Sequence, residues 1–278
     1  MTIAARGFDR LMSVASLPMY DLPEIADQTR AFWRGLAGHL RDVGVVRVPE
    51  TLAKEPKLPH HWLSDDLLFS QTCGYPFVRF LGGRVKLVAT PCYCAPGCKG
   101  ADYCSIVVVH RDAPYRAFAD LRGKRAAVNN PDSQSGYNAL RALVAPMSSG
   151  GRFFADAVKS GSHVGSLSLV AAGKAEVAAI DCVTFALLSR YRPAVVAEVR
   201  ELCRTARAPG LPYIMSKSFG EAQLKQVRLA LGAAINDPSL RQTRSALLLE
   251  GIRLLPETEY IRISDMEAIA SARNCHAL

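Results

Sequence analysis

The chain lacks several features that would assign it to other classes of protein. None of its apolar runs reaches the roughly 18 residues that a membrane-spanning helix needs, so we expect no membrane insertion. It has no dense Lys/Arg run, no stripe of basic and aromatic residues and no recognised nucleic-acid motif, so we expect no nucleic-acid partner. Internal repeats and low-complexity tracts are also missing. These absences favour an ordinary globular protein.

An export signal is also missing from the sequence as written. The first ten residues are interrupted by charged side chains and contain no apolar segment of the kind found in secretory signals. The sequence as written therefore predicts a cytoplasmic protein. A periplasmic location is expected instead if a signal was removed from this chain.

Length and charge favour two lobes and a small anionic ligand. The chain has 278 residues, of which 49% are apolar and 21% charged, enough for two lobes of ordinary domain size. The net charge is +9, and residues 110–209 hold 14 Lys/Arg against 8 Asp/Glu. A positive cleft in this middle region would attract small anions.

Four of the eight cysteines, Cys92, Cys94, Cys98 and Cys104, lie within thirteen residues. Their spacing lacks the paired C-x2-C of structural zinc sites. Buried free thiols are a common use of cysteine, so we expect no metal and no cofactor. A metal site or a redox pair at these residues remains an alternative.

Strand and helix patterns alternate through most of the chain, which predicts an α/β architecture. We expect strands at residues 13–17, 45–48, 67–71, 85–89, 106–109, 126–128 and 177–180. We expect helices at residues 23–41, 152–159, 166–172, 221–235 and 237–250, and another that opens near Tyr137. The pattern restarts after His110, so we predict one lobe from 1–108 plus 210–278 and an inserted lobe from 109–209.

Residues 129–137 are the most informative segment. They follow a short apolar strand pattern and lead into a helix whose apolar face contains Tyr137, Leu140 and Val144. The start of a helix presents unpaired backbone N–H groups at the positive end of the helix dipole. Ser133 and Ser135 place hydroxyls beside these donors, which suits a phosphate, phosphonate or carboxylate. Plain N-capping explains the same residues equally simply.

Other polar groups follow predicted strands directly. Ligands of open α/β sheets bind outside the carboxyl ends of strands, so such residues can converge. Besides the segment 129–136, the residues in this position are Tyr20, Thr72, Cys73, Gly74 and Tyr75.

Several segments resemble, in the expected order, one family of transport proteins. Residues 130–137 (NPDSQSGY) resemble the D-P-x-S-x-S-G-[FY] turn of the phosphonate/phosphite/phosphate ABC-transporter substrate-binding proteins. Residues 103–108 (YCSIVV) resemble that family's strand crossing to the second lobe, and 118–124 (FADLRGK) its lead-in to the turn. Residues 160–163 (SGSH) and 173–181 (GKAEVAAID) match two further motifs. The matches span roughly residues 13–215.

The resemblance implies a type 2 periplasmic-binding-protein fold, with two α/β lobes and two crossover strands that close on an oxyanion. It implies a non-catalytic solute-binding protein that either feeds an ABC permease, a possible partner, or acts as a soluble sensor. The residues implied to bind the ligand are the bend Ser133, Gln134, Ser135 and Gly136, the donors Tyr103 and His163, Asp181, the facing loop Thr72, Cys73, Gly74 and Tyr75, and Tyr20. Asp181 would face an amino group or a protonated ligand oxygen.

Two observations keep other functions open. Val164 stands where better-known phosphonate binders have an acidic residue, which argues against 2-aminoethylphosphonate itself. Thiamin-pyrimidine synthases and some menaquinone-pathway enzymes resemble the same fold, so an enzyme is an alternative. The alternatives to a solute-binding protein are therefore an enzyme on this scaffold and a metal binder through the cysteine cluster.

Overall fold

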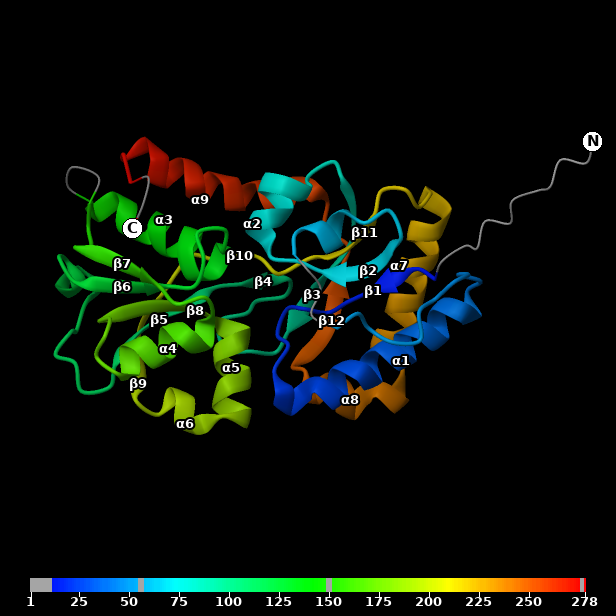
Figure 1. Ribbon diagram of the computed structural model, residues 1–278, viewed down its shortest axis with the longest axis horizontal. Helices are drawn as coiled ribbons and strands as arrows, with labels where there is room; N and C mark the ends of the chain where they lie inside the picture. The colour runs from blue at the N-terminus through cyan, green and yellow to red at the C-terminus, as the bar shows by residue number, and fades with distance from the viewer. Residues whose placement is uncertain (1–11, 55–57, 149–151, 276–277) are drawn as a thin grey trace, which may run out of the picture.

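The computed structural model describes residues 12–54, 58–148, 152–275 and 278. Two five-stranded sheets, each flanked by helices, lie side by side along the long axis of the molecule (Figure 1). A two-stranded ladder of β4 (Asp102–Tyr103) and β10 (Ala208–Pro209) lies where the chain passes between them. The predicted α/β architecture is confirmed. Within the described ranges, no helix is both long and apolar enough to cross a membrane.

The first sheet combines strands from both ends of the chain. Its order is β1 (Val14–Ala15), β2 (Leu67–Gln71), β11 (Tyr213–Ser216), β3 (Val85–Tyr93) and β12 (Leu249–Arg253). β1 and β2 are parallel, whereas β11 runs antiparallel to both β2 and β3, and β12 runs antiparallel to β3. One face packs against α1 (Ala26–Asp42), α7 (Glu221–Asn236) and the short α8 (Arg241–Ala246).

The predicted first helix forms because its apolar residues recur at helical spacing. Phe32, Leu36 and Leu40 lie on one face of α1 and are buried, together with Trp33. The Trp33 ring stacks on Phe69 of β2, with ring centroids 6.2 Å apart. The sequence pattern therefore fixes both the helix and the sheet face that it covers.

The second sheet has the order β7 (Asp156–Lys159), β6 (Arg125–Val128), β8 (Val177–Asp181), β5 (Ser105–His110) and β9 (Val199–Arg204). β6 is parallel to β7 and β8, and β5 is antiparallel to β8 and β9. Because side chains alternate along a strand, Ala178 and Ile180 face α4 (His163–Ala171) and α5 (Cys182–Tyr191). Val177 and Ala179 face α3 (Ala139–Val144).

Short helical segments complete the fold. Of these, α2 (Gly74–Pro76) and α6 (Pro193–Val196) are α-helical turns, and Phe77–Leu81 and Gln134–Asn138 are π-helical turns. Single 3₁₀ turns are Pro23–Ile25, His60–Leu63, Phe118–Leu121, Ala145–Met147, Pro238–Leu240 and Glu257–Tyr260. π-helical turns recur at functional sites, and both of these flank the cleft described below.

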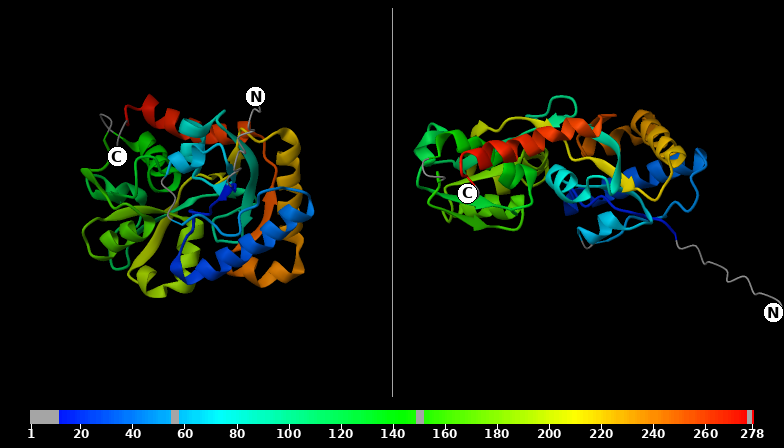
Figure 2. Two further views of the ribbon diagram at one scale, coloured as in Figure 1. Left: turned by 45° about the vertical axis from the view of Figure 1, so that its right-hand side comes forward. Right: turned by 90° about the horizontal axis from the view of Figure 1, so that it is seen from above.

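The C-terminal helix α9 (Ile261–Ala272), which the sequence did not predict, runs across both halves (Figures 1 and 2). Ile263 and Met266 pack in a core cluster of the first sheet, whereas Ala270 packs with the second sheet. Arg262 makes two 2.8 Å hydrogen bonds to the carboxylate of Asp102 on β4. The end of the chain therefore does not belong to the first half alone, as the range 210–278 had implied. The two-lobe division otherwise stays a prediction.

Three predicted elements differ in the structure, two of them because the backbone turns where we expected regular structure. Residues 45–48 form no strand, since Gly44 and Arg47 have φ angles of 83° and 58°. The segment 152–159 ends in strand β7, which pairs in parallel with β6 instead of forming a helix. The helix expected at 237–250 ends at Ala246, because Leu248 has a φ of 56° and β12 follows.

Candidate functional site

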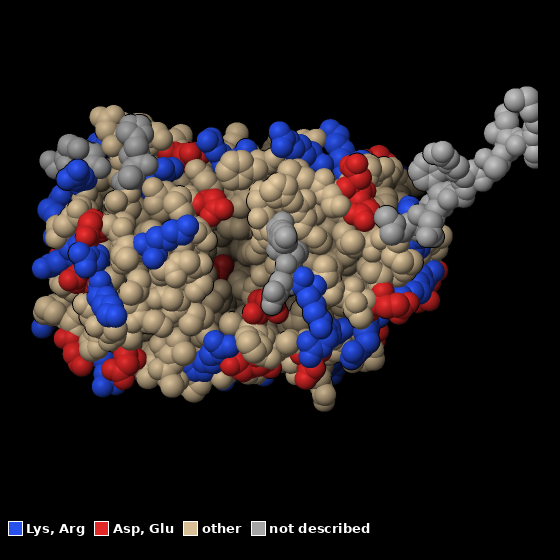
Figure 3. Space-filling view, viewed as in Figure 1, with Lys and Arg blue, Asp and Glu red and all other residues tan. Residues whose placement is uncertain are grey.

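A cleft of about 620 Å³ opens between the two halves, and Figure 3 shows it as a hollow in the middle of the surface. Strand ends and helix starts from both halves line it. Of the predicted site residues, those that line the cleft are Tyr20, Cys73, Ser133, Ser135, His163 and Asp181. Six of the twelve predicted residues therefore converge on one space, and their role in binding stays a prediction.

The bend at residues 133–136 starts the helical segment that continues into α3. Ser133 is the N-cap, and its Oγ accepts a hydrogen bond of 3.0 Å from the Gly136 amide. The Gln134 amide points across the cleft and donates to the Cys73 Sγ at 3.4 Å. The Ser135 amide has no hydrogen-bond partner among the described residues. N-capping and an available donor therefore coexist in this bend.

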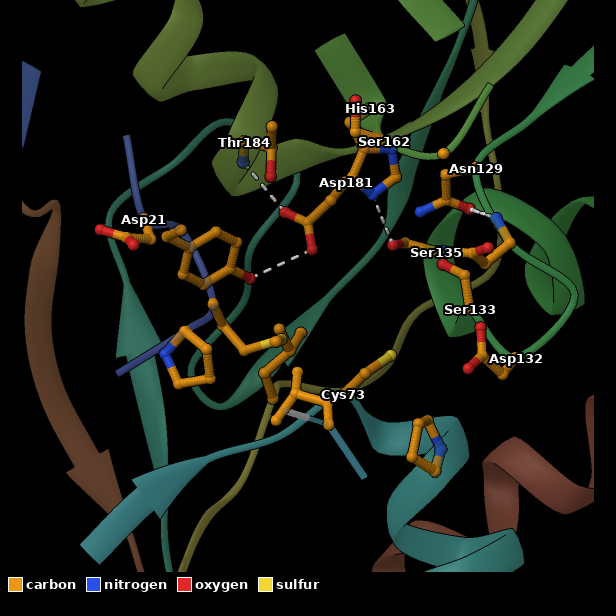
Figure 4. Close-up of a pocket in the computed structure, with 18 of the residues that line it drawn as sticks. Asp21, Cys73, Asn129, Asp132, Ser133, Ser135, Ser162, His163, Asp181 and Thr184 are labelled. Atoms are coloured by element: carbon orange, nitrogen blue, oxygen red, sulfur yellow. Dashed lines mark hydrogen bonds between the residues drawn. The ribbon is translucent and has the colours of Figure 1, made fainter. Parts of the chain in front are cut away.

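Ser135 and His163 form a polar pair on the wall of the cleft (Figure 4). The Ser135 Oγ lies 3.0 Å from Nε2 of His163, the first residue of α4. Ser162 caps α4, because its Oγ accepts from the Gly165 amide at 3.0 Å. Burial lowers the pKa of His163 to about 4, so its imidazole is neutral at pH 7. The pair can offer hydrogen bonds but no positive charge.

Asp181 holds α5 and connects the two halves. Its Oδ1 accepts hydrogen bonds from the amides of Val183 at 2.8 Å and Thr184 at 3.0 Å, which caps α5. Its Oδ2 accepts a 3.1 Å hydrogen bond from the Tyr20 hydroxyl, which comes from the other half of the molecule. Burial raises the pKa of Asp181 to about 6. The carboxyl group therefore has a structural role in addition to facing the cleft.

Cys73 lines the cleft, and Tyr103 is buried close to it. The Tyr103 side chain is buried, and its hydroxyl has no hydrogen-bond partner among the described residues. Burial, with smaller contributions from Cys73 and Asp181, raises the pKa of Tyr103 well above its usual range. Burial also raises the pKa of the Cys73 thiol to about 11, so the thiol is protonated at pH 7. Tyr103 is not among the residues that line the cleft, so its contact with a ligand stays a prediction.

The remaining predicted residues turn away from the cleft, chiefly toward α9. The Tyr75 hydroxyl donates to the Glu267 carboxylate at 2.8 Å, and the Gln134 amide group lies 3.0 Å from the Met266 sulfur. Thr72 is fully buried, and Gly74 packs so closely under Ile263 that a Cβ would lie 2.4 Å from its Cδ1. Gly136 contributes an amide that Ser133 already binds. These residues do not line the cleft, and their contact with a ligand stays a prediction.

The charge of the cleft is opposite to what we predicted. Asp21, Asp132 and Asp181 line it, and none of the described lining residues is Lys or Arg. The basic residues of 110–209 lie elsewhere, many in surface ion pairs such as Arg125 with Asp156. An anion in this cleft would be held by backbone amides, hydroxyls and helix dipoles, not by cationic side chains.

Sequence reasoning missed several lining residues. Asn129, Ser162 and Thr184 add polar groups, and Trp62 and Phe80 add aromatic rings. Asn129 directly follows strand β6 and lies in the segment 129–136 that the strand-end rule selected, but it was not among the predicted ligand-binding residues. The aromatic residues carry no comparable signal, because core packing explains such rings equally well.

The cysteines that are close in sequence do not form one cluster in space. Cys98 Sγ lies 3.6 Å from Cys182 Sγ, whereas the exposed Cys94 bonds to the Leu248 carbonyl at 3.4 Å. Cys92 is buried on β3. Across the described ranges, no three His, Cys, Asp or Glu side chains gather in a way that would hold a metal ion.

Replacing Gly136 by alanine is expected to disrupt the bend. An added Cβ would lie 2.0 Å from the Asn129 Oδ1, which accepts a hydrogen bond from the Asn130 amide. Asn129 must then move and lose that bond, so we expect a loss of about 1–3 kcal/mol in the free energy of unfolding, measured in urea. Gly38→Ala, in an open position of α1, is the control and should stabilise by about 0.5–1 kcal/mol. Equal stability of Gly136→Ala and the unchanged protein would contradict the packing described.

Comparison with solved structures shows where else this fold occurs. A binding-protein component of an ABC phosphonate transporter from Pseudomonas aeruginosa is 13% identical, with a TM-score of 0.74 over 96% of this chain and 88% of that chain. PhnD1 from Prochlorococcus marinus, in complex with methylphosphonate, is 15% identical, with a TM-score of 0.73 over 95% and 98%. A Xanthomonas citri protein bound to chloride ion is 18% identical, with a TM-score of 0.71 over 96% and 99%. These likenesses confirm the periplasmic-binding-protein fold.

The sequence itself carries the family assignment. No curated protein matches it significantly. The profile of the family described as "ABC transporter, phosphonate, periplasmic substrate-binding protein" matches residues 56–260, about three-quarters of the chain. The matched range contains the bend at 133–136, His163 and Asp181. The chain therefore belongs to the family of periplasmic substrate-binding proteins of phosphonate ABC transporters.

Proposed function

We propose that this chain captures a small phosphonate or phosphate oxyanion in the cleft between its two halves and delivers it to an ABC permease. The observation that carries the proposal is the convergence of two kinds of donor on one space. These are the unpaired Ser135 amide at a helix start and the Ser135–His163 pair, which both line the cleft. In the family role, the protein works in the periplasm.

The chemistry of these donors fits an oxyanion, although no Lys or Arg is among the described residues that line the cleft. Hydrogen bonds from amides and hydroxyls to a charged oxygen are short and stronger than bonds between neutral groups. The positive end of the helical segment that begins at Gln134 adds a favourable potential. Because the lining comes from both halves, closure of the cleft on a bound anion would exclude water and strengthen each contact.

The Ser135–His163 pair favours binding over catalysis. A serine nucleophile needs a base with a pKa near the working pH, and burial lowers the pKa of His163 to about 4. Among the described residues, no carboxylate orients Nδ1 of His163. The pair therefore lacks both the basicity and the third group that an acyl-transfer triad uses. We infer a ligand contact, not a reaction centre.

A thermal-shift panel tests this function. Phosphate, methylphosphonate, sulfate and acetate are each added to the protein at a range of concentrations. We expect at least one phosphorus oxyanion to raise the melting temperature, because a ligand at a hundredfold excess over its dissociation constant stabilises the folded state by about 2.7 kcal/mol. No shift with either phosphorus oxyanion would contradict the proposal, and a shift with acetate alone would assign the cleft to carboxylates.

A further inference from the structure

The two walls of the cleft differ in character. The half built on the second sheet contributes polar groups, among them Asn129, Ser133, Ser135, Ser162 and His163. The other half contributes mostly apolar side chains: Pro18, Met19, Leu22, Leu58, Pro59, Trp62, Pro76, Phe80 and Leu211. A ligand that fills the cleft therefore meets hydrogen-bonding groups on one side and hydrocarbon on the other.

The apolar wall presents rings and alkyl groups without free polar atoms. The Trp62 indole N–H donates to the Gln71 carbonyl at 3.2 Å, so only hydrocarbon from this ring faces the cleft. Phe80 is half exposed, at 50%. It belongs to the π-helical turn Phe77–Leu81 and lines the cleft together with Leu58, which is 38% exposed. Exposed apolar side chains that meet at a cleft mark a place for an apolar partner.

The size of the cleft agrees with an organic ligand. Its volume of about 620 Å³ lies within the range of roughly 300–1,000 Å³ found for organic-ligand sites. An inorganic oxyanion bound at Ser135 would leave the apolar wall facing water. Trp62 is already buried, so a ligand with an apolar substituent would instead cover the exposed surface of Phe80 and Leu58, and burial of that surface favours binding.

We propose that the ligand is an organophosphonate or a phosphate monoester whose phosphoryl group binds at Ser135 and whose apolar substituent packs on Phe80 and Leu58. This inference rests on the proposed function, since it needs the anion at the bend. It goes further in assigning the other half of the cleft to an aryl or alkyl group. Methylphosphonate and inorganic phosphate are then the weaker ligands.

Calorimetric titration with a matched pair of ligands tests the inference. Methylphosphonate and phenylphosphonate share the phosphonate group and differ in the size of the substituent. We expect phenylphosphonate to bind at least tenfold more tightly, because the ring buries several more carbon atoms. In Phe80→Ala, the ratio of the two dissociation constants should fall at least threefold. Leu229→Ala, which removes an exposed apolar side chain from α7, outside the cleft, should leave the ratio unchanged.

The outcomes separate this inference from the function on which it rests. If methylphosphonate binds as tightly as phenylphosphonate or more tightly, the apolar subsite is wrong and the oxyanion site stands. The same holds if Phe80→Ala leaves the ratio at its original value. If neither phosphonate binds, the apolar subsite fails, and if phosphate gives no thermal shift either, both proposals fail. Because Phe80 is half exposed, its replacement should not prevent folding, which the melting temperature of the variant checks.

Discussion

Ser135→Ala is expected to weaken the binding of a phosphonate about ten- to hundredfold. The substitution removes a buried hydroxyl that lies in the cleft, 3.0 Å from Nε2 of His163. A hydrogen bond to a charged group contributes about 1.5–3 kcal/mol, and each 1.4 kcal/mol corresponds to a factor of ten in the dissociation constant. Titration calorimetry with methylphosphonate or phenylphosphonate, whichever binds the unchanged protein more tightly, measures the change.

A second serine supplies the control for this effect. Ser168 lies on the exposed face of α4, where its Oγ donates to the Val164 carbonyl at 3.0 Å. Ser168→Ala makes the same chemical change on the helix that begins with His163, but outside the cleft. It should leave the dissociation constant within about twofold, well inside the effect of a lost charged hydrogen bond. Equal loss of affinity in both variants would mean that Ser135 acts through stability and not through ligand contact.

Asp181→Asn and His163→Gln are expected to change the pH dependence of stability in opposite directions. Burial raises the pKa of Asp181 to about 6, so between pH 4 and 6 the folded state holds a proton that the unfolded state releases. The contribution of Asp181 to the free energy of unfolding therefore falls as the pH rises through this window, by about 3 kcal/mol for a shift of two pKa units.

His163 has the opposite sign. Burial lowers its pKa to about 4, so between pH 4 and 6.5 the unfolded state binds the extra proton. The contribution of His163 to the free energy of unfolding rises with pH over nearly the same window, and the two groups offset each other. Asp181→Asn removes one contribution, so the stability of that variant should rise from pH 4 to 6.5. His163→Gln removes the other, and its stability should fall from pH 4 to 6.

Urea unfolding at pH 4, 5, 6 and 7, followed by tryptophan fluorescence, measures these profiles. Asp265→Asn, at an exposed position of α9, is the control and should keep the profile of the unchanged protein. Profiles of the same slope in Asp181→Asn and His163→Gln would contradict the opposite effects of burial on the two groups. The comparison of slopes does not depend on the absolute stability of either variant.

The sequence pattern predicted those elements whose own residues determine them. Phe32, Leu36 and Leu40 recur at helical spacing and form the buried face of α1. The apolar runs at 67–71 and 177–180 are buried strands, as expected. Elements that depend on the backbone or on distant partners were missed. The polar edge strand β7 forms because β6 pairs with it in parallel. The strand β12 can begin at Leu249 because the positive φ of Leu248 ends the helical segment before it.

The site shows the same limit. Residues at strand ends and helix starts were found from sequence, because the cleft is built from those positions: Cys73 follows β2, and His163 begins α4. The direction of each side chain was not found. Tyr75 and Gln134 turn toward α9, a helix that the pattern did not predict and that supplies Glu267 and Met266. The acidic lining of the cleft was not predicted either. The fold decides which charged side chains line a cleft, and the net charge of a stretch of sequence does not.

The most direct test of anion binding at the bend is the structure of the protein with a bound phosphonate. We expect a phosphonate oxygen within about 3 Å of the Ser135 amide and of its Oγ, with Tyr103 as a further donor. The substituent of an aryl phosphonate should then lie against Phe80. A phosphonate bound elsewhere, with the Ser135 amide still without a partner, would contradict the proposed site.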